Sequence, residues 1–375
     1  MARTEGTYFR ATERCWEMSH VTGTHVKIAE THGLKTRKLM LVAPLAALIY
    51  PFMLKGFNAS VTMITSVGAN GGALPWITAA ISLLIAFAVP TIALLMAMSF
   101  AEITAPTAAE VRAKRVALLA VAAPTIFTFV GVVLYMLGDP IPDSWALVVF
   151  WAVVAVMVAR ADNKTLARTT VAPVLAGLRV AHGVSALAIV AIFLALHITN
   201  HLTGLAGPTT YDAVMKVFRH VYRTELLQPV LVALFFFQIA TGIYFVWRYT
   251  AAPSDRFRTF QIASGVYLAF YVLGHMNSVF VFARTYLGID TGWGFATGAP
   301  TGLVQDAWNI RLVPHYALGV FFVLSHIAAG ARVVMLSNGV RKALADRVMI
   351  GGASAAGVIA VLIILGMCGL RLQFI

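Results

Sequence analysis

The sequence predicts an all-α, polytopic integral membrane protein, and three observations lead to that prediction. The chain of 375 residues is 60% hydrophobic and only 11% charged, whereas roughly a quarter of the residues in an ordinary soluble domain are charged. Apolar runs of about 20 residues, the length of helix that crosses a bilayer, recur along the chain. The basic residues collect in alternate loops between these runs, which is typical of membrane proteins.

The apolar runs predict about nine transmembrane helices. A basic cytoplasmic tail (1–38) and a four-helix membrane region of unknown role (39–175) come first. A four-helix bundle is expected over 176–336, and a final transmembrane helix over 337–375. The expected spans are 39–55, 74–100, 116–137, 145–160, 178–206, 228–247, 259–284, 312–336 and 348–370.

The net charge of +13 is explained by orientation in the membrane. The N-terminal tail and the even-numbered loops carry 21 of the 28 Lys and Arg residues. By the positive-inside rule, this places the N-terminus in the cytoplasm or an organelle matrix and the C-terminus on the opposite side. Such a basic face can bind anionic membrane lipid or a soluble partner. It gives no reason to expect nucleic-acid binding.

Several kinds of site are disfavoured by motifs that the sequence lacks. Cys15 and Cys368 match no zinc spacing, no disulfide framework and no C-x-x-C-H haem attachment. No flavin or dinucleotide fingerprint occurs. All 15 acidic residues fit in tails, loops or span edges, which disfavours a transporter, because ion-coupled transport commonly uses carboxylates inside the membrane.

The ionisable residues inside the expected spans are histidines, and six of the ten lie in the fifth, seventh and eighth spans. With a rise of about 1.5 Å per residue, His197 lies roughly 28 Å and His275 roughly 24 Å from the cytoplasmic ends of their helices. His197 and His275 therefore share a depth in the outer half of the membrane. The others lie at roughly 6 Å (His182), 15 Å (His326), 31 Å (His315) and 34 Å (His201).

Two imidazoles at one depth on different helices are what a haem clamped between helices requires. Each supplies one axial ligand to iron, and a neutral imidazole carries no charge into the bilayer. The alternative is that both are core histidines hydrogen-bonded to neighbouring helices. His201, one turn beyond His197, is expected at the rim, although a register shift of one turn would exchange the two.

The second half of the chain also contains an internal repeat. The segments FFFQIATGIYFVWR (235–248) and VLSHIAAGARVVML (323–336) align without a gap, so Gln238 falls opposite His326. Two copies of a two-helix unit make a four-helix bundle with ligand positions facing inward. Small residues would let helices or a porphyrin face approach closely. They are Gly183, Gly242, Gly265 and Gly330.

Residues of about 178–336 resemble the membrane cytochrome b of the succinate dehydrogenase/fumarate reductase family, in its fused two-haem form. The resemblance consists of short motifs. His182 and His197 have the family's fifteen-residue spacing, and QIASGVYLAFYVLGH (261–275) is similar to its helix that ends in a ligand histidine. HIAAGAR (326–332) matches the family's H-x-x-x-G-x-R helix, with Arg332 as its last residue.

The resemblance implies that His197 and His275 hold an outer haem b, and that positions 238 and 326 hold an inner one. Position 238 is glutamine, which is not a normal haem ligand. We therefore expect one haem b, or two if His326 finds another partner such as His182. Arg332 and His326 are candidates for an inner ligand site or a quinone site. Arg284 and Arg311, at the outer ends of two spans, are candidate partners for the haem propionates.

These expectations describe a membrane-anchor subunit that transfers electrons between a redox partner or quinone and haem b, and not a complete enzyme. The resemblance further implies a flavoprotein and an iron–sulfur partner on the cytoplasmic face. The first alternative is a haem-less structural or assembly anchor in a larger membrane complex, favoured by Gln238. The second is the small-molecule transporter that the distribution of acidic residues disfavours.

Overall fold

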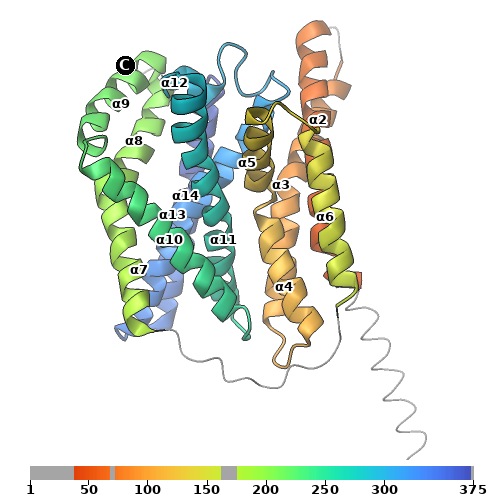
Figure 1. Ribbon diagram of the computed structural model, residues 1–375, viewed down its shortest axis with the longest axis vertical. Helices are drawn as coiled ribbons and strands as arrows, with labels where there is room; N and C mark the ends of the chain where they lie inside the picture. Colours follow the sequence, from red (N-terminus) through yellow and green to blue (C-terminus); the bar gives the residue numbers. More distant parts are fainter. Residues whose placement is uncertain (1–37, 68–71, 162–174, 373–375) are drawn as a thin grey trace, which may run out of the picture.

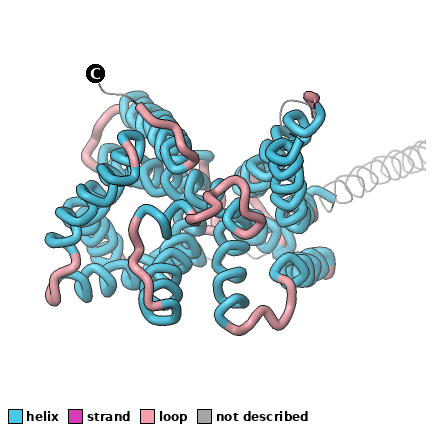
Figure 2. Tube along the Cα trace, turned by 90° about the horizontal axis from the view of Figure 1, so that it is seen from above, coloured by secondary structure: helices cyan, strands magenta, loops and turns pink. Residues whose placement is uncertain are grey.

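We describe a computed structural model that covers residues 38–67, 72–161 and 175–372. The predicted basic tail (1–38) lies outside the described residues except for its last residue. All the secondary structure of the described part is helical, with loops and no strand (Figure 2). This confirms the all-α class.

The first helical region comprises five helices, and Figure 1 shows them together on one side of the molecule. They are α2 (Val42–Val67), α3 (Leu74–Ala101), α4 (Ala108–Val121), α5 (Ala123–Met136) and α6 (Asp143–Ala159). The bend of 64° between α4 and α5 falls at Ala122, just before Pro124. Proline has no N–H to donate to the preceding turn, so the helix cannot continue straight through it.

The second region contains the remaining described α-helices and four segments of π- or 3-10 helix. The chain enters it through α7 (Ala176–Ile189), the π-helical segment η2 (Val190–Leu194), α8 (Ala195–Thr203) and η3 (Gly204–Ala206). It continues through α9 (Pro208–Tyr222), α10 (Leu227–Tyr249), α11 (Arg256–Met276) and the π-helical η4 (Asn277–Leu287). It ends with α12 (Trp293–Thr297), η5 (Asn309–Arg311), α13 (Leu312–Ser337) and α14 (Lys342–Met367).

Among the described residues, seven helices are long and apolar enough to cross a membrane, and the bent α4–α5 pair would make eight. Helix α6 is apolar but has only 17 residues. The membrane character is therefore supported, whereas the nine-span count is not confirmed. Large apolar side chains on the outside of the second region, such as Leu187 (68% exposed) and Ile243 (57%), are typical of lipid-facing helices.

The arrangement of the second region differs from the expected four-helix bundle. Helix α14 packs along α13 and also contacts α8 and η3, so the helix predicted to follow the bundle is part of its wall. A methyl group added at Gly352 of α14 would collide with the Ala328 side chain of α13. Glycine and alanine at this crossing allow the close approach, as small residues do between membrane helices. Helix α11 joins the two regions, because it contacts α10 and α13 as well as α3, α4 and α5.

Candidate functional site

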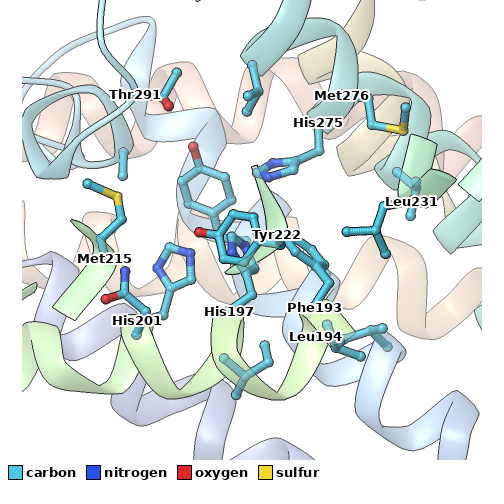
Figure 3. A pocket seen from close by; sticks show the side chains of 18 of the residues that line it. Phe193, Leu194, His197, His201, Met215, Tyr222, Leu231, His275, Met276 and Thr291 are labelled. Carbon is cyan, nitrogen blue, oxygen red and sulfur yellow. The ribbon is translucent and has the colours of Figure 1, made fainter. Parts of the chain in front are cut away.

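A cavity of about 220 Å³ lies inside the second region, and three of the predicted histidines line it. His197 and His201 come from α8, and His275 comes from α11. Figure 3 shows these three side chains directed into one space, with Tyr222 of α9 in front of His197. Most of the remaining wall is apolar or aromatic, and it is contributed by α9, α10, α11, α13 and α14.

The rings of His197 and His275 lie across this space with their centroids 6.0 Å apart and their planes at 71°. Aromatic neighbours fix both orientations. Phe193 stacks on His197 at 4.8 Å, and Tyr271 stacks on His275 at 5.7 Å with the planes nearly parallel, at 8°. The sequence thus brings together two histidines 78 positions apart, at the shared depth that helix geometry predicts.

Both histidine-bearing helices contain π-helical turns next to the histidine. Segment η2 ends at Leu194, three residues before His197, and η4 begins at Asn277, two residues after His275. A π turn holds an extra residue, so it rotates the side chains that follow relative to those that precede it. Such turns occur frequently at functional sites. Hydropathy shows the helix but gives no signal for these turns.

The geometry of the pair fits a metal-centred group between the two rings. Two imidazoles bound through one nitrogen each on opposite sides of a metal have ring centroids roughly 6 Å apart, because metal–nitrogen bonds are about 2 Å long. The 6.0 Å separation agrees with this value. The apolar and aromatic wall suits the flat face of a porphyrin, and His197 and His275 are the residues that would hold its iron.

Three arginines stand at the mouth of the cavity. Arg219 of α9 and Arg223 both donate to Thr291 Oγ at 2.9 Å, and Arg284 of η4 donates to Gln228 Oε1 at 3.2 Å. Burial, together with the charges of Arg219 and Arg284, lowers the pKa of Arg223 to about 10. Arg284 was expected here from the sequence. Arg219 and Arg223 were not.

Polar atoms without partners also line the cavity. Nδ1 of His201 and Oδ1 of Asn200 are buried and have no hydrogen-bond partner within the described residues. His201 lies 4.7 Å from His197 between ring centroids and 5.5 Å from Tyr211. The predicted rim histidine is therefore a wall residue beside the pair, on the side nearer to α9.

The two inner histidines, His182 and His326, have different surroundings. His182 Nδ1 lies 2.6 Å from Thr241 Oγ of α10, and His326 Nδ1 lies 2.8 Å from Ser264 Oγ of α11. Gln238 does not point at His326. Its Nε2 donates to the His182 carbonyl at 2.7 Å and to Ser185 Oγ at 2.6 Å.

Two of the four glycines singled out in the sequence, Gly265 and Gly330, also differ in their surroundings. A methyl group at Gly265 would lie 3.3 Å from His326 Cε1, so the absence of a side chain there allows α11 and α13 to meet. A methyl group at Gly330 would meet nothing within 4 Å. Arg332 donates to Asp346 Oδ1 at 2.7 Å and stacks on Phe257 at 4.4 Å, so its guanidinium joins α13 to α14 and α11.

Arg311 lies away from the cavity, contrary to its predicted place beside a haem. It pairs with Asp143 of α6 at 2.5 Å, and its guanidinium stacks on Phe127 at 4.4 Å and on Trp308 at 4.5 Å. The side chain is only 7% exposed. Position at a helix end was the reason for the prediction, but the Arg311 side chain contacts Phe127 of α5 and Asp143 of α6 and does not line the cavity.

Arg219 and Arg223 were missed because the segment between the fifth and sixth spans was taken as an outer loop. It forms the amphipathic helix α9, in which Tyr211, Met215 and Arg219 recur every four residues and all line the cavity. This i, i+4 spacing is visible in the sequence and is the signal that could have located the helix.

Within the described residues, no group of three or more His, Cys, Asp or Glu side chains is arranged to hold a metal ion. Comparisons with known proteins add no assignment, since the chain matches no family model, no curated protein and no solved structure.

Proposed function

We propose that this protein is a membrane-embedded electron-transfer subunit in which His197 and His275 hold one haem b. The observation that carries the proposal is the contact between the two imidazole rings, 6.0 Å apart between centroids, inside a cavity walled mainly by apolar and aromatic side chains. The resemblance of short motifs to complex II-type cytochrome b supports the same pair.

A haem with two histidine ligands has both axial positions filled, so it passes single electrons and does not bind oxygen. The residues of this chain hold and shield it. Phe193 and Tyr271 keep the imidazoles in their orientations through stacking. The surrounding apolar side chains exclude water and lower the local dielectric, which is one of the means by which a protein sets a haem potential.

We propose the electron donor and acceptor by chemical class only. One is a quinone in the bilayer, and the other is a soluble flavoprotein and iron–sulfur partner on the basic face. The orientation proposed with them has the N-terminus in the cytoplasm, because the tail and the even-numbered loops carry most of the basic residues. The cavity then lies in the outer half of the membrane.

The experiment that tests this function is a dithionite-reduced minus oxidised spectrum of the purified chain, with a haem count by pyridine haemochrome. We expect one haem b per chain, and its loss in His275→Ala. The matched control is His326→Ala, which removes a histidine of the same bundle and should leave the count unchanged. A wild-type chain without haem would contradict the proposal.

A haem-less structural anchor is the second candidate, and Gln238 favours it. Its amide ties α10 to α7 through the His182 carbonyl and Ser185 Oγ. A polar side chain used in this way stabilises helix association within a membrane. In this reading the histidines serve packing, so His275→Ala would lower stability and leave the visible spectrum of the protein featureless, as in the wild type.

A further inference from the structure

Three guanidinium groups lie at the mouth of the cavity, and the acidic side chains nearby balance their positive charge only in part. Arg219 pairs with Asp290 at 3.0 Å, but the Asp290 side chain is 72% exposed, so solvent weakens that attraction. Asp212, the other acid nearby, accepts a hydrogen bond from the Trp293 backbone N–H at 2.9 Å. We call Arg219, Arg223 and Arg284 the rim arginines.

Apart from the Asp290 carboxylate that pairs with Arg219, the acceptors that hold the rim arginines are neutral. Arg219 and Arg223 converge on the single hydroxyl of Thr291 at 2.9 Å each, and Arg284 donates to Gln228 at 3.2 Å. Like charges brought this close repel each other unless an anion lies among them. Asp290 supplies one negative charge to these three guanidinium groups, so a further anion among them would lower the repulsion that remains.

Buried nitrogen atoms without hydrogen-bond partners also belong to residues that line this cavity. Nε of Arg219 is buried without a hydrogen-bond partner among the described residues, as is Nδ1 of His201. Both residues, together with Arg223 and Arg284, line the cavity. A guanidinium presents paired N–H donors that match the two oxygens of a carboxylate or a phosphate, and such charge-assisted bonds are about twice as strong as neutral ones.

We propose that the rim arginines form an oxyanion-binding site, with Arg219 and Arg223 of α9 and its C-terminal end as the main contacts. The ligand class is a carboxylate pair or a phosphate at one end of an apolar molecule, because the site opens into an apolar cavity. Two sources present this chemistry: the propionates of a porphyrin and the headgroup of an anionic phospholipid. The first rests on the proposed function, and the second does not.

The first test uses the full-length chain produced without haem and titrated with haem or with haem dimethyl ester, which lacks the carboxylate charges. The wild type should bind haem at least about tenfold more tightly than the ester, since a hydrogen bond to a charged group contributes about 1.5–3 kcal/mol. Arg219→Gln with Arg223→Gln should abolish this preference. Lys216→Gln, which removes an exposed positive charge from the same helix, should preserve it.

The second test identifies the lipid source. Phosphatidylglycerol and phosphatidylcholine bound to the haem-free chain are counted by native mass spectrometry. A preference for phosphatidylglycerol that the double variant loses, and Lys216→Gln keeps, would support a headgroup site even if the wild type bound neither haem compound. If the wild type bound neither haem compound, that result by itself would contradict the haem proposal. If the double variant matched the wild type in both tests, or the wild type showed no preference in either, the oxyanion site would be overturned.

Discussion

The two histidine pairs of the second region are arranged in different ways. The ring contacts of the described residues include His197 with His275 at 6.0 Å but not His182 with His326. The outer rings are oriented by stacked aromatic side chains. The inner rings are oriented by hydroxyl groups on neighbouring helices. The rings of the outer pair are thus in contact with each other, whereas each ring of the inner pair is held by a hydrogen bond to a hydroxyl group.

The inner hydroxyls also determine which ring nitrogen carries the proton. Thr241 Oγ donates to the Phe237 carbonyl at 2.6 Å, and Ser264 Oγ donates to the Gln261 carbonyl at 3.0 Å. Because the hydroxyl hydrogens are used, each oxygen accepts from the Nδ1–H of its histidine. Metal-bound histidines commonly have such a partner. The comparison teaches that a hydroxyl partner can orient each inner ring without bringing the two rings into contact.

The largest expected effect is a difference in haem content between a variant of the outer pair and a variant of the inner pair. The two substituted histidines lie in one continuous stretch of helix. If His197 and His275 hold a haem as proposed, His197→Ala should abolish the haem spectrum, because it removes one of the two proposed ligands, whereas His182→Ala should retain it. The measurement is the haem count per folded chain, with folding checked by gel filtration in detergent. Loss of haem in both variants to the same degree would remove the distinction between outer and inner pairs.

The next effect concerns Arg311, which the sequence placed beside the outer pair and the structure places in an ion pair with Asp143. Asp143→Asn leaves a buried guanidinium without its counter-charge, so we expect a loss of about 3–5 kcal/mol in the free energy of unfolding. Haem content per folded chain should not change. Both quantities can be measured in detergent, by denaturant unfolding and by haemochrome.

Glu102→Gln is the control for this ion-pair variant. It breaks the pair with Arg256, in which both side chains are more than half exposed. Exposed pairs contribute about 0–1 kcal/mol. Equal destabilisation by the two variants would mean that the Arg311–Asp143 pair is not buried in solution as it is in the structure.

Two glycines of α13 give a smaller contrast. A methyl group at Gly319 would collide with the ring of Tyr271, which stacks on His275. Gly319→Ala should therefore destabilise the protein by about 1–3 kcal/mol through overpacking, and it should shift the haem absorbance. The methyl group of Gly330→Ala would lie in open space. This substitution should leave the stability of the protein unchanged or raise it by up to about 1 kcal/mol, because glycine inside a helix is less favourable than alanine. Similar thermal midpoints for the two variants would contradict this expectation.

Much of the outer site was predictable, because it depends on helix geometry. The rise per residue places His197 and His275 at one depth, and the structure brings them together. The all-α class was predictable from the apolar composition, because a chain in lipid must satisfy its backbone hydrogen bonds within each segment. Both arguments use properties that each residue carries by itself.

The rest depends on neighbours that the sequence does not reveal. Gln238 aligns with His326 in the internal repeat, yet its amide turns to α7. The role of α14 in the wall depends on Gly352 meeting Ala328 across 24 positions. Arg219 and Arg223 lie on a helix, α9 and its C-terminal end, in a segment between two predicted spans where no helix was expected. In each case the missing information is a contact between helices.

The smallest effect tests whether the inner pair is a haem site that lacks a single ligand. The family resemblance implies that Gln238→His would supply that ligand and raise the haem count from one to two. The structure favours no change, because side chain 238 is directed at Ser185 rather than at His326. The stability should change by only about 1 kcal/mol, because Gln238 makes two hydrogen bonds and each contributes about 0.6 kcal/mol between membrane helices, and Gln238→Leu should give the same loss. A second haem in Gln238→His, absent from Gln238→Leu, would mean that α10 can turn its side chain toward α13, and that the inner half has kept the geometry of a cofactor site.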